Sequence, residues 1–215
     1  VFVECGLPRN DIFFKENKEL ISSIKKHFGL EENIKIVLYA PTFRGSGKGT
    51  ASTNLLDVKR LIRSLHKRFG GEWVCLFRGH YFYNSPKELL PKGFIDASDY
   101  DDMQELLYTA DVLITDYSSC IWDFSLTYRP SFIYARDIDT YIQKDRDFYT
   151  PINEWPYPIA RNNDELVYNI ENFDESDYIA KVKEHHDKLG CCETGKASDF
   201  VAERIYAECF NQKKN

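Results

Sequence analysis

Three polar segments of this chain combine side chains and spacings that could bind an anion. The first, residues 40–50 (APTFRGSGKGT), has three alternating glycines that free the backbone to approach a ligand, while Arg44 and Lys48 supply positive charge. The segment follows an apolar run, and open α/β sheets bind ligands at the carboxyl ends of their strands. It therefore predicts a phosphate-binding loop, although it has neither the GxxxxGK(S/T) nor the GxGxxG spacing. A mobile surface loop is the alternative.

The second segment, Arg78, Gly79 and His80, directly follows the apolar run WVCLF. A histidine there could act as a general acid or base near neutral pH or donate a hydrogen bond to a phosphate, and Arg78 could pair with an oxyanion. A capping or solvent-exposed histidine is the alternative. The other four histidines occur in amphipathic helical patterns, and we expect them on helix surfaces, at positions 27, 66, 185 and 186.

The third segment, residues 115–119 (TDYSS), marks the change from the most apolar strand candidate to a helix. Unpaired backbone N–H groups at a helix N-terminus attract anions, so together with the hydroxyls of Ser118 and Ser119 they predict a diphosphate site. Simple capping by Asp116 or Ser118 is the alternative. A serine nucleophile is disfavoured because GxSxG is absent. About one helical turn further on, Asp123 could pair with an arginine or a donor hydroxyl.

These segments require an alternation of strands and helices to place them together. Short apolar runs predict strands, and 3.6-residue periodicity bounded by glycine or proline predicts helices. The expected strands are 34–40, 73–77, 94–96, 111–115 and 131–135, with a further strand-like run at 1–3. The expected helices are 54–71, 103–109, 116–128, 164–173, 176–189 and 197–210. This order predicts an α/β domain with a parallel sheet and a helical C-terminal tail starting at about residue 163.

Composition narrows the class of protein. The chain has 215 residues, a net charge of −6 and 43% hydrophobic residues, which is typical of a globular protein and disfavours a nucleic-acid-binding surface. Six cysteines without a CxxC pair do not suggest a disulfide framework or a zinc site, and we expect Cys191 and Cys192 to be reduced thiols. No membrane span or signal peptide is apparent. We expect a cytoplasmic protein, with peripheral attachment to the inner face of the plasma membrane left open. The start without Met inside an apolar run suggests a domain of a longer polypeptide.

Residues 98–141, SDYDDMQELLYTADVLITDYSSCIWDFSLTYRPSFIYARDIDTY, resemble the bacterial CDP-glycerol glycerophosphotransferase family, the teichoic-acid and capsule polymerases and primases. Further matches are LPRND at 7–11 to the family's GxPRND turn, VLYAPTFR at 37–44 to LYAPTWRD, FRGH at 77–80 to a basic residue followed by His-Pro, and GKAS at 195–198 to a C-terminal signature. The resemblance covers nearly the whole chain in the family's order. Two departures occur: Gly45 replaces the usual Asp, and Tyr81 replaces the usual Pro.

The resemblance implies a GT-B-type transferase, of which the 215 residues form a single Rossmann-like, donor-binding C-terminal domain while the N-terminal acceptor domain is missing. The implied donor is CDP-glycerol or a related CDP-polyol, the implied acceptor is a polyol phosphate or a polysaccharide, and no cofactor or metal is implied. Membrane contact would come through the parent protein. Positioning and charge neutralisation should dominate such phosphoryl transfer. Carried over position by position, the resemblance points to His80, Arg44, Asp116, Ser118 and Ser119. Together with the three polar segments, we predict catalytic roles for His80 and Asp116. The predicted donor-binding residues are Thr42, Arg44, Arg78, Ser118, Ser119 and Asp123.

Alternatives to this function remain open. A GT-B enzyme that uses a nucleotide sugar or CDP-ribitol would differ in the donor it binds. A nucleotide-binding module without turnover would differ in activity, and the two departures at Gly45 and Tyr81 put activity and donor choice in question.

Overall fold

A six-stranded parallel sheet with the order β3-β2-β1-β4-β5-β6 forms the centre of the protein. Its strands are β1 (Lys35–Ala40), β2 (Trp73–Phe77), β3 (Phe94–Asp96), β4 (Val112–Thr115), β5 (Ser131–Tyr134) and β6 (Ile159–Ala160). The structure is a computed structural model and describes residues 3–42, 56–79, 90, 92–144, 148 and 150–210. Every residue of β4 and β5 is buried, as expected for parallel strands that are covered by helices on both faces.

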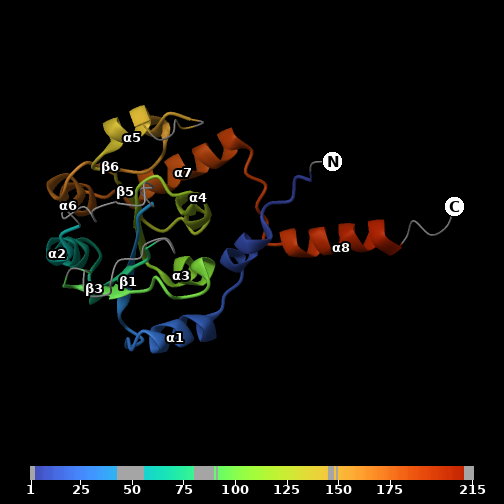
Figure 1. Ribbon diagram of the computed structural model, residues 1–215, viewed down its shortest axis with the longest axis horizontal. Coiled ribbons are helices and arrows are strands. Elements are labelled where there is room, and N and C mark those ends of the chain that lie inside the picture. Colours follow the sequence, from blue (N-terminus) through green and yellow to red (C-terminus); the bar gives the residue numbers. More distant parts are fainter. Residues whose placement is uncertain are drawn as a thin grey trace.

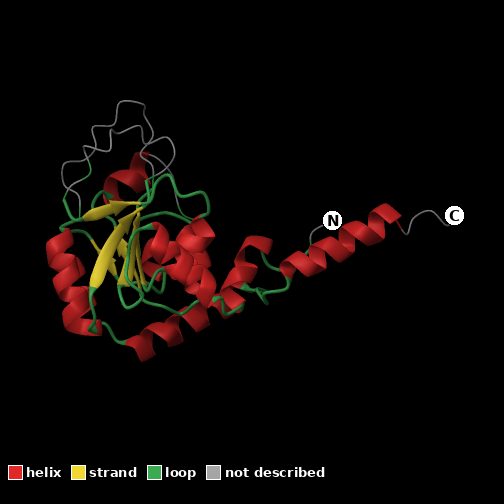
Figure 2. Ribbon diagram, turned by 90° about the horizontal axis from the view of Figure 1, so that it is seen from below, coloured by secondary structure: helices red, strands yellow, loops and turns green. Residues whose placement is uncertain are grey.

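Helices cover both faces of this sheet. On one face α2 packs against α6, and α3, α4 and α7 lie on the other (Figures 1 and 2). The helical elements are η1 (Pro8–Phe14), α1 (Lys18–His27), α2 (Val58–Phe69), α3 (Met103–Thr109), α4 (Cys120–Ser125), α5 (Ile138–Lys144), η3 (Ile152–Glu154), α6 (Asn163–Glu171), α7 (Glu175–Leu189) and α8 (Ala197–Phe210). The sheet is thus the middle layer of three.

Local capping explains where several helices begin. The side chains of Asp57, Asp102 and Asp174 accept hydrogen bonds from backbone N–H groups in the first turns of α2, α3 and α7. Helix α7 ends at Gly190, whose φ of 66° places it in the left-handed region that favours glycine. These signals can be found in the sequence, and the predicted boundaries of α3 and α7 are correct to within one residue, as are those of α8. Helix α2, in contrast, is shorter than the predicted helix 54–71, because it begins after the Asp57 cap and ends before Gly70.

Helix α8 extends away from the sheet and its covering helices (Figures 1 and 2). Large apolar side chains along it are exposed: Phe200, Ile205, Tyr206 and Phe210 have exposed fractions of 48%, 57%, 62% and 65%. In the ranges that the structure describes, no helix is both long and apolar enough to cross a membrane.

The predicted α/β class, the parallel sheet and the five main strands are confirmed. Of the strand predicted at 1–3, only Val3 lies in the described ranges, and it is exposed and outside any strand, contrary to the prediction. The helix predicted over 116–128 is too long: α4 covers only Cys120–Ser125, and residues 116–119 form the turn that leads into it. Five elements of the structure were not predicted from the sequence: η1, α1, α5, η3 and β6.

Candidate functional site

The carboxyl ends of β1 and β4 form the centre of the candidate site. These strands are neighbours in parallel register, with Ala40 opposite Thr115, and the sheet continues in opposite directions from them. The Thr115 hydroxyl donates to the Ala40 carbonyl at 2.6 Å. A sheet of this order has its topological switch point between β1 and β4, where open α/β sheets bind ligands. Two predicted residues, Thr42 and Asp116, lie directly beyond these ends.

Thr42 and Asp116 are in direct contact. One oxygen of the Asp116 carboxylate accepts hydrogen bonds from the Thr42 backbone N–H at 2.8 Å, from the Thr42 hydroxyl at 2.5 Å and from the Tyr117 backbone N–H at 2.6 Å. Asp116 is only 3% exposed. The carboxylate therefore holds the beginning of the loop after β1 against the turn after β4. These contacts favour a positioning role for Asp116, and its predicted catalytic role stays a prediction.

The two predicted serines lie in the turn between β4 and α4. Ser118 is half-buried, and its hydroxyl accepts a long hydrogen bond of 3.4 Å from the Cys120 backbone N–H. Ser119 is the N-cap residue of α4, yet its side chain makes no capping hydrogen bond, and it is exposed. The capping alternative thus accounts for Ser118 only in part and does not account for Ser119. Ser119 is thus an exposed residue at the switch point of the sheet.

Arg78 lies at the same edge, directly after β2, and joins it to the segment after β3. Its Nη1 donates to the carbonyl oxygens of Ala97 at 2.9 Å and Ser98 at 2.6 Å, and also to that of Tyr100. Burial lowers the pKa of the Arg78 guanidinium, and the carboxylates of Asp99 and three neighbouring aspartates oppose that shift. Arg78 thereby fixes the shape of this edge, and its predicted contact with the donor stays a prediction.

Two other predicted residues, Arg44 and His80, lie outside the described residues, as do the glycine-rich loop and the departures at Gly45 and Tyr81. The residue before His80 is described: the Gly79 backbone N–H donates to the Ser98 hydroxyl at 2.9 Å. A Cβ atom at Gly79 would lie 3.1 Å from the Phe77 ring and 3.2 Å from that hydroxyl. The chain that leads to His80 is therefore packed closely against the segment after β3.

Asp123, in α4, belongs to a polar network that includes residues near the start of the chain. Its carboxylate accepts hydrogen bonds from Arg9 at 3.0 and 3.2 Å, from the Asn10 amide at 3.0 Å and from the Gln104 amide at 3.1 Å. The expected pairing with an arginine is therefore confirmed, although the partner lies 114 positions earlier in the chain. These four donors favour a structural role over the predicted donor-binding role.

The same region attaches α8 to the rest of the chain. Asp11, in η1, accepts hydrogen bonds from the backbone N–H groups of Ala197 at 2.9 Å and Ser198 at 2.8 Å, at the start of α8. Burial raises the pKa of the Asp11 carboxyl, but the hydrogen bonds from Ser198 and Ala197 outweigh it and lower that pKa overall. Residues 7–11 and 195–198, two motifs quoted above for their resemblance, thus meet in the fold. The sequence signal for this contact is the run of polar residues in PRND, to which the sequence pattern alone assigned no structural role.

The prediction that all four helical histidines lie on helix surfaces is wrong for two of them. His27 and His66 are exposed as predicted, but His185 is 6% exposed and His186 is half-buried, with its Nε2 2.8 Å from the Ser125 hydroxyl. Both lie on the side of α7 that faces the body of the domain, where Trp122 stacks on His185. In the part of the chain that the structure describes, no three His, Cys, Asp or Glu side chains are grouped so that they could hold a metal ion.

A parallel sheet of this strand order, covered by helices on both faces and with hydroxyl and carboxylate groups at its switch point, defines a Rossmann-like α/β fold. Comparison with known proteins identifies the family. Residues 1–207 match the model of the CDP-glycerol:poly(glycerophosphate) glycerophosphotransferases, and the chain belongs to that family.

Curated relatives include two teichoic acid enzymes. The chain is 32% identical to the teichoic acid poly(glycerol phosphate) polymerase of Staphylococcus epidermidis, an alignment that covers 98% of this chain and 30% of the polymerase. It is 34% identical to the teichoic acid poly(ribitol-phosphate) polymerase of Bacillus spizizenii, over 94% of this chain and 33% of that one. The chain thus spans about a third of the length of these relatives.

A solved structure, that of the wall teichoic acid polymerase TagF, is 31% identical, with a TM-score of 0.78 over 99% of this chain and 53% of that one. This likeness confirms the GT-B-type fold class. A structure of a TagF variant soaked with CDPG is 32% identical, with a TM-score of 0.76 over 98% of this chain and 53% of that one.

Proposed function

We propose that this chain is the donor-binding domain of a CDP-glycerol glycerophosphotransferase. The enzyme would transfer glycerol phosphate from CDP-glycerol to a polyol phosphate or polysaccharide acceptor during synthesis of a teichoic-acid or capsule-like polymer. The observation that carries the proposal is the contact between Thr42 and Asp116 at the β1–β4 switch point, in a chain whose family acts on CDP-glycerol.

The chemistry of this edge fits a diphosphate. Ser119 is exposed at the start of α4, and the Thr42–Asp116 contact fixes the segment after β1 two positions before Arg44. Hydroxyl and N–H donors bind phosphate oxygens, and an arginine neutralises their charge. His80 would be the proton donor or charge stabiliser at the bond that breaks. Asp116 would then position these groups, and an N-terminal acceptor domain of a longer polypeptide would form the other wall of the cleft.

A calorimetric titration of the chain with CDP-glycerol tests the proposal, with UDP-glucose as the competing donor class. We expect saturable binding of CDP-glycerol, weaker binding of UDP-glucose, and stabilisation of the fold by about 2.7 kcal/mol at a ligand concentration of about 100 Kd. Equal affinity for both nucleotides would contradict the cytidine assignment. Absence of nucleotide binding would favour an interaction module instead.

The double substitution Ser118→Ala and Ser119→Ala tests the site itself. It removes two hydroxyl donors but leaves the backbone N–H groups, so donor binding should weaken by about 1–3 kcal/mol. Ser23→Ala, at an exposed position of α1, is the matched control. Loss of stability with unchanged affinity for CDP-glycerol would show that the serines only cap α4.

CDP-ribitol is a second candidate donor, because the chain is 34% identical to a poly(ribitol-phosphate) polymerase and 32% identical to a poly(glycerol phosphate) polymerase. The two donors share the cytidine diphosphate part and differ in the length of the polyol. A competition titration between the two donors decides between them, and tighter binding of CDP-ribitol would replace CDP-glycerol in the proposal.

A further inference from the structure

Tyr117 lies in the turn between β4 and α4, with Asp116 before it and Ser118 and Ser119 after it. Its side chain is only 9% exposed, so the ring is packed into the domain and not directed at solvent. The hydroxyl of a buried tyrosine usually has a hydrogen-bond partner. That partner shows which part of the fold holds the turn.

The Tyr117 hydroxyl joins this turn to the segment after β5. It donates a hydrogen bond of 3.0 Å to an oxygen of the Asp137 carboxylate. Asp137 lies between the end of β5 and α5, and its carbonyl oxygen accepts a hydrogen bond from the Tyr141 N–H at 2.8 Å, in the first turn of α5. Because β4 and β5 are parallel neighbours, both segments leave the same edge of the sheet. The hydrogen bond therefore connects two neighbouring strand ends.

The Tyr117 ring also packs against α5. It stacks on the Tyr141 ring, with centroids 3.9 Å apart and an angle of 19° between the planes, and the Phe148 ring centroid lies 5.6 Å away. Tyr141 is likewise only 9% exposed. Stacked aromatic rings attract each other, and their flat faces restrict how one ring can turn relative to the other. The hydroxyl and the ring thus hold Tyr117 to the same element.

The turn after β4 is therefore fixed from both sides. Toward β1, the Asp116 carboxylate accepts hydrogen bonds from the Thr42 backbone N–H at 2.8 Å and from its hydroxyl at 2.5 Å. Toward β5, the turn is held by Tyr117. The two serines follow directly, and hydroxyl groups bind a ligand well only when neighbouring side chains keep them in place. The position of Ser118 and Ser119 thus depends on the contacts of Tyr117.

We propose that Tyr117 is a positioning residue for donor binding. Through its hydrogen bond to Asp137 it holds Ser118 and Ser119 where the diphosphate of the donor binds. The inference rests on the proposed function, and it adds a residue that the sequence pattern did not single out. Tyr117 acts through the turn and not by contact with the donor, because its hydroxyl is bonded to Asp137 and its ring is stacked on Tyr141.

Tyr117→Phe tests this role, because it keeps the ring on Tyr141 and removes only the hydrogen bond to Asp137. We expect the affinity for CDP-glycerol, measured by calorimetry on the 215-residue chain, to fall about two- to thirtyfold. In a chain that already carries Ser118→Ala and Ser119→Ala, the same change should have little further effect, because the hydroxyls that it positions are missing. An equal loss in both backgrounds, or no loss in the wild-type background, would overturn the proposal.

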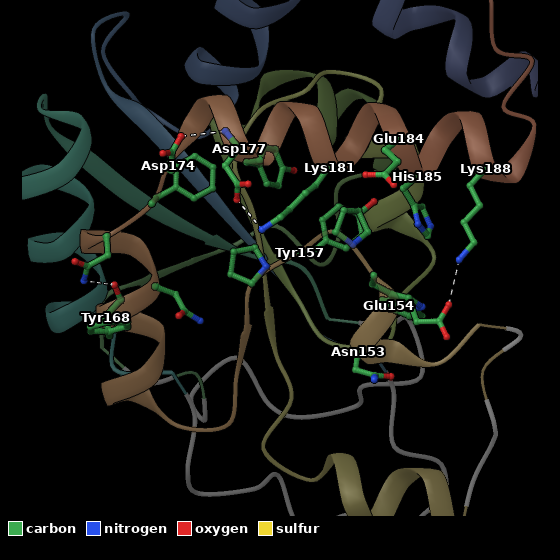
Figure 3. A pocket seen from close by; sticks show the side chains of 17 residues that line it. Asn153, Glu154, Tyr157, Tyr168, Asp174, Asp177, Lys181, Glu184, His185 and Lys188 are labelled. Atoms are coloured by element: carbon green, nitrogen blue, oxygen red, sulfur yellow. Dashed lines mark hydrogen bonds and ion pairs between the residues drawn. The ribbon is translucent and has the colours of Figure 1, made fainter.

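Two further variants separate positioning from a general loss of stability. Asp137→Asn keeps an acceptor oxygen for the Tyr117 hydroxyl and should retain most of the affinity, whereas Asp137→Leu should behave like Tyr117→Phe. Tyr178→Phe is the matched control: Tyr178 is buried, its hydroxyl donates to the Ser131 hydroxyl at 3.0 Å at the opposite end of β5, and it lines a pocket under α7 (Figure 3) that contains none of the predicted donor-site residues. It should lower the melting temperature without changing the affinity for CDP-glycerol. An equal loss of affinity in Tyr178→Phe would contradict a specific role for Tyr117.

Hydrogen exchange without a donor separates this inference from the proposed function. The N–H groups of Ile121 and Trp122 donate to the carbonyl oxygens of Ser118 and Ser119, at 3.3 and 3.1 Å, so their exchange reports how well the turn is held. Both amides should exchange faster in Tyr117→Phe than in the wild type and equally fast in Tyr178→Phe and the wild type. Unchanged exchange in Tyr117→Phe would overturn the positioning role alone. A wild-type chain that binds no CDP-glycerol would instead overturn the proposed function, and with it the role of this turn in donor binding.

Discussion

Replacing Asp123 by Asn separates its structural role from donor binding. The carboxylate is buried and accepts four hydrogen bonds, two from Arg9 and one each from Asn10 and Gln104. An asparagine has the same shape but offers one acceptor oxygen, and its own NH₂ group would face donors. Two of the charge-assisted hydrogen bonds should therefore be lost.

We expect the loss to cost about 2–4 kcal/mol, because a hydrogen bond to a charged group contributes about 1.5–3 kcal/mol. The Arg9 side chain is 51% exposed and can be resolvated, which keeps the cost at the low end of that range. For a domain of this size the melting temperature should fall by about 5–15 °C. Thermal unfolding followed by circular dichroism measures this change.

The matched control is Asp139→Asn, which removes a carboxylate that is 77% exposed and pairs with Arg161 at 3.4 Å. A surface pair of this kind contributes about 0–1 kcal/mol, so the melting temperature should change by at most about 4 °C. Both variants should retain CDP-glycerol affinity at a temperature where they are folded. An Asp123→Asn protein that melts like the wild type and binds CDP-glycerol tenfold more weakly would refute the structural role and restore the predicted donor contact.

The remaining predictions concern α8 and catalysis. Asp11→Asn should accelerate hydrogen exchange at the amides of Ala197 and Ser198, because their acceptor loses its charge. The pKa of Asp11 in the folded protein lies below its ordinary 3.8, so protection of these amides should be full above pH 4 and should be lost as the pH falls through the folded pKa. Asp11→Asn should abolish this pH dependence. Equally fast exchange of these amides in both proteins would contradict the prediction. The isolated chain should release no CMP when it is given CDP-glycerol and a polyol phosphate, because in the proposed function it forms only one wall of the active-site cleft. Acceptor-dependent release would disprove the missing-domain hypothesis. His80→Ala in a longer polypeptide that contains this domain should lower kcat about 100-fold with little change in donor affinity, and unchanged turnover would exclude a catalytic histidine.

The sequence alone was sufficient for the framework of the fold. The runs that became β4 and β5 are short, apolar and followed by polar stops, so they predict buried parallel strands without any knowledge of their neighbours. The strand-to-loop ends also located Thr42 and Asp116, because parallel strands deliver their carboxyl ends to one edge. Motifs carried the family assignment, which residues 1–207 confirm.

Only the tertiary structure decided which polar residues support one another. Asp123 pairs with Arg9, 114 positions away, and Asp11 binds the first amide of α8, 186 positions away, and no local pattern records either separation. His185 has the amphipathic spacing of a surface residue but becomes buried because Trp122 of α4 packs against that side of α7. Local propensity and periodicity describe what one segment prefers. Burial and pairing between segments depend on how the whole chain packs, and this packing formed the Asp123 network and buried His185.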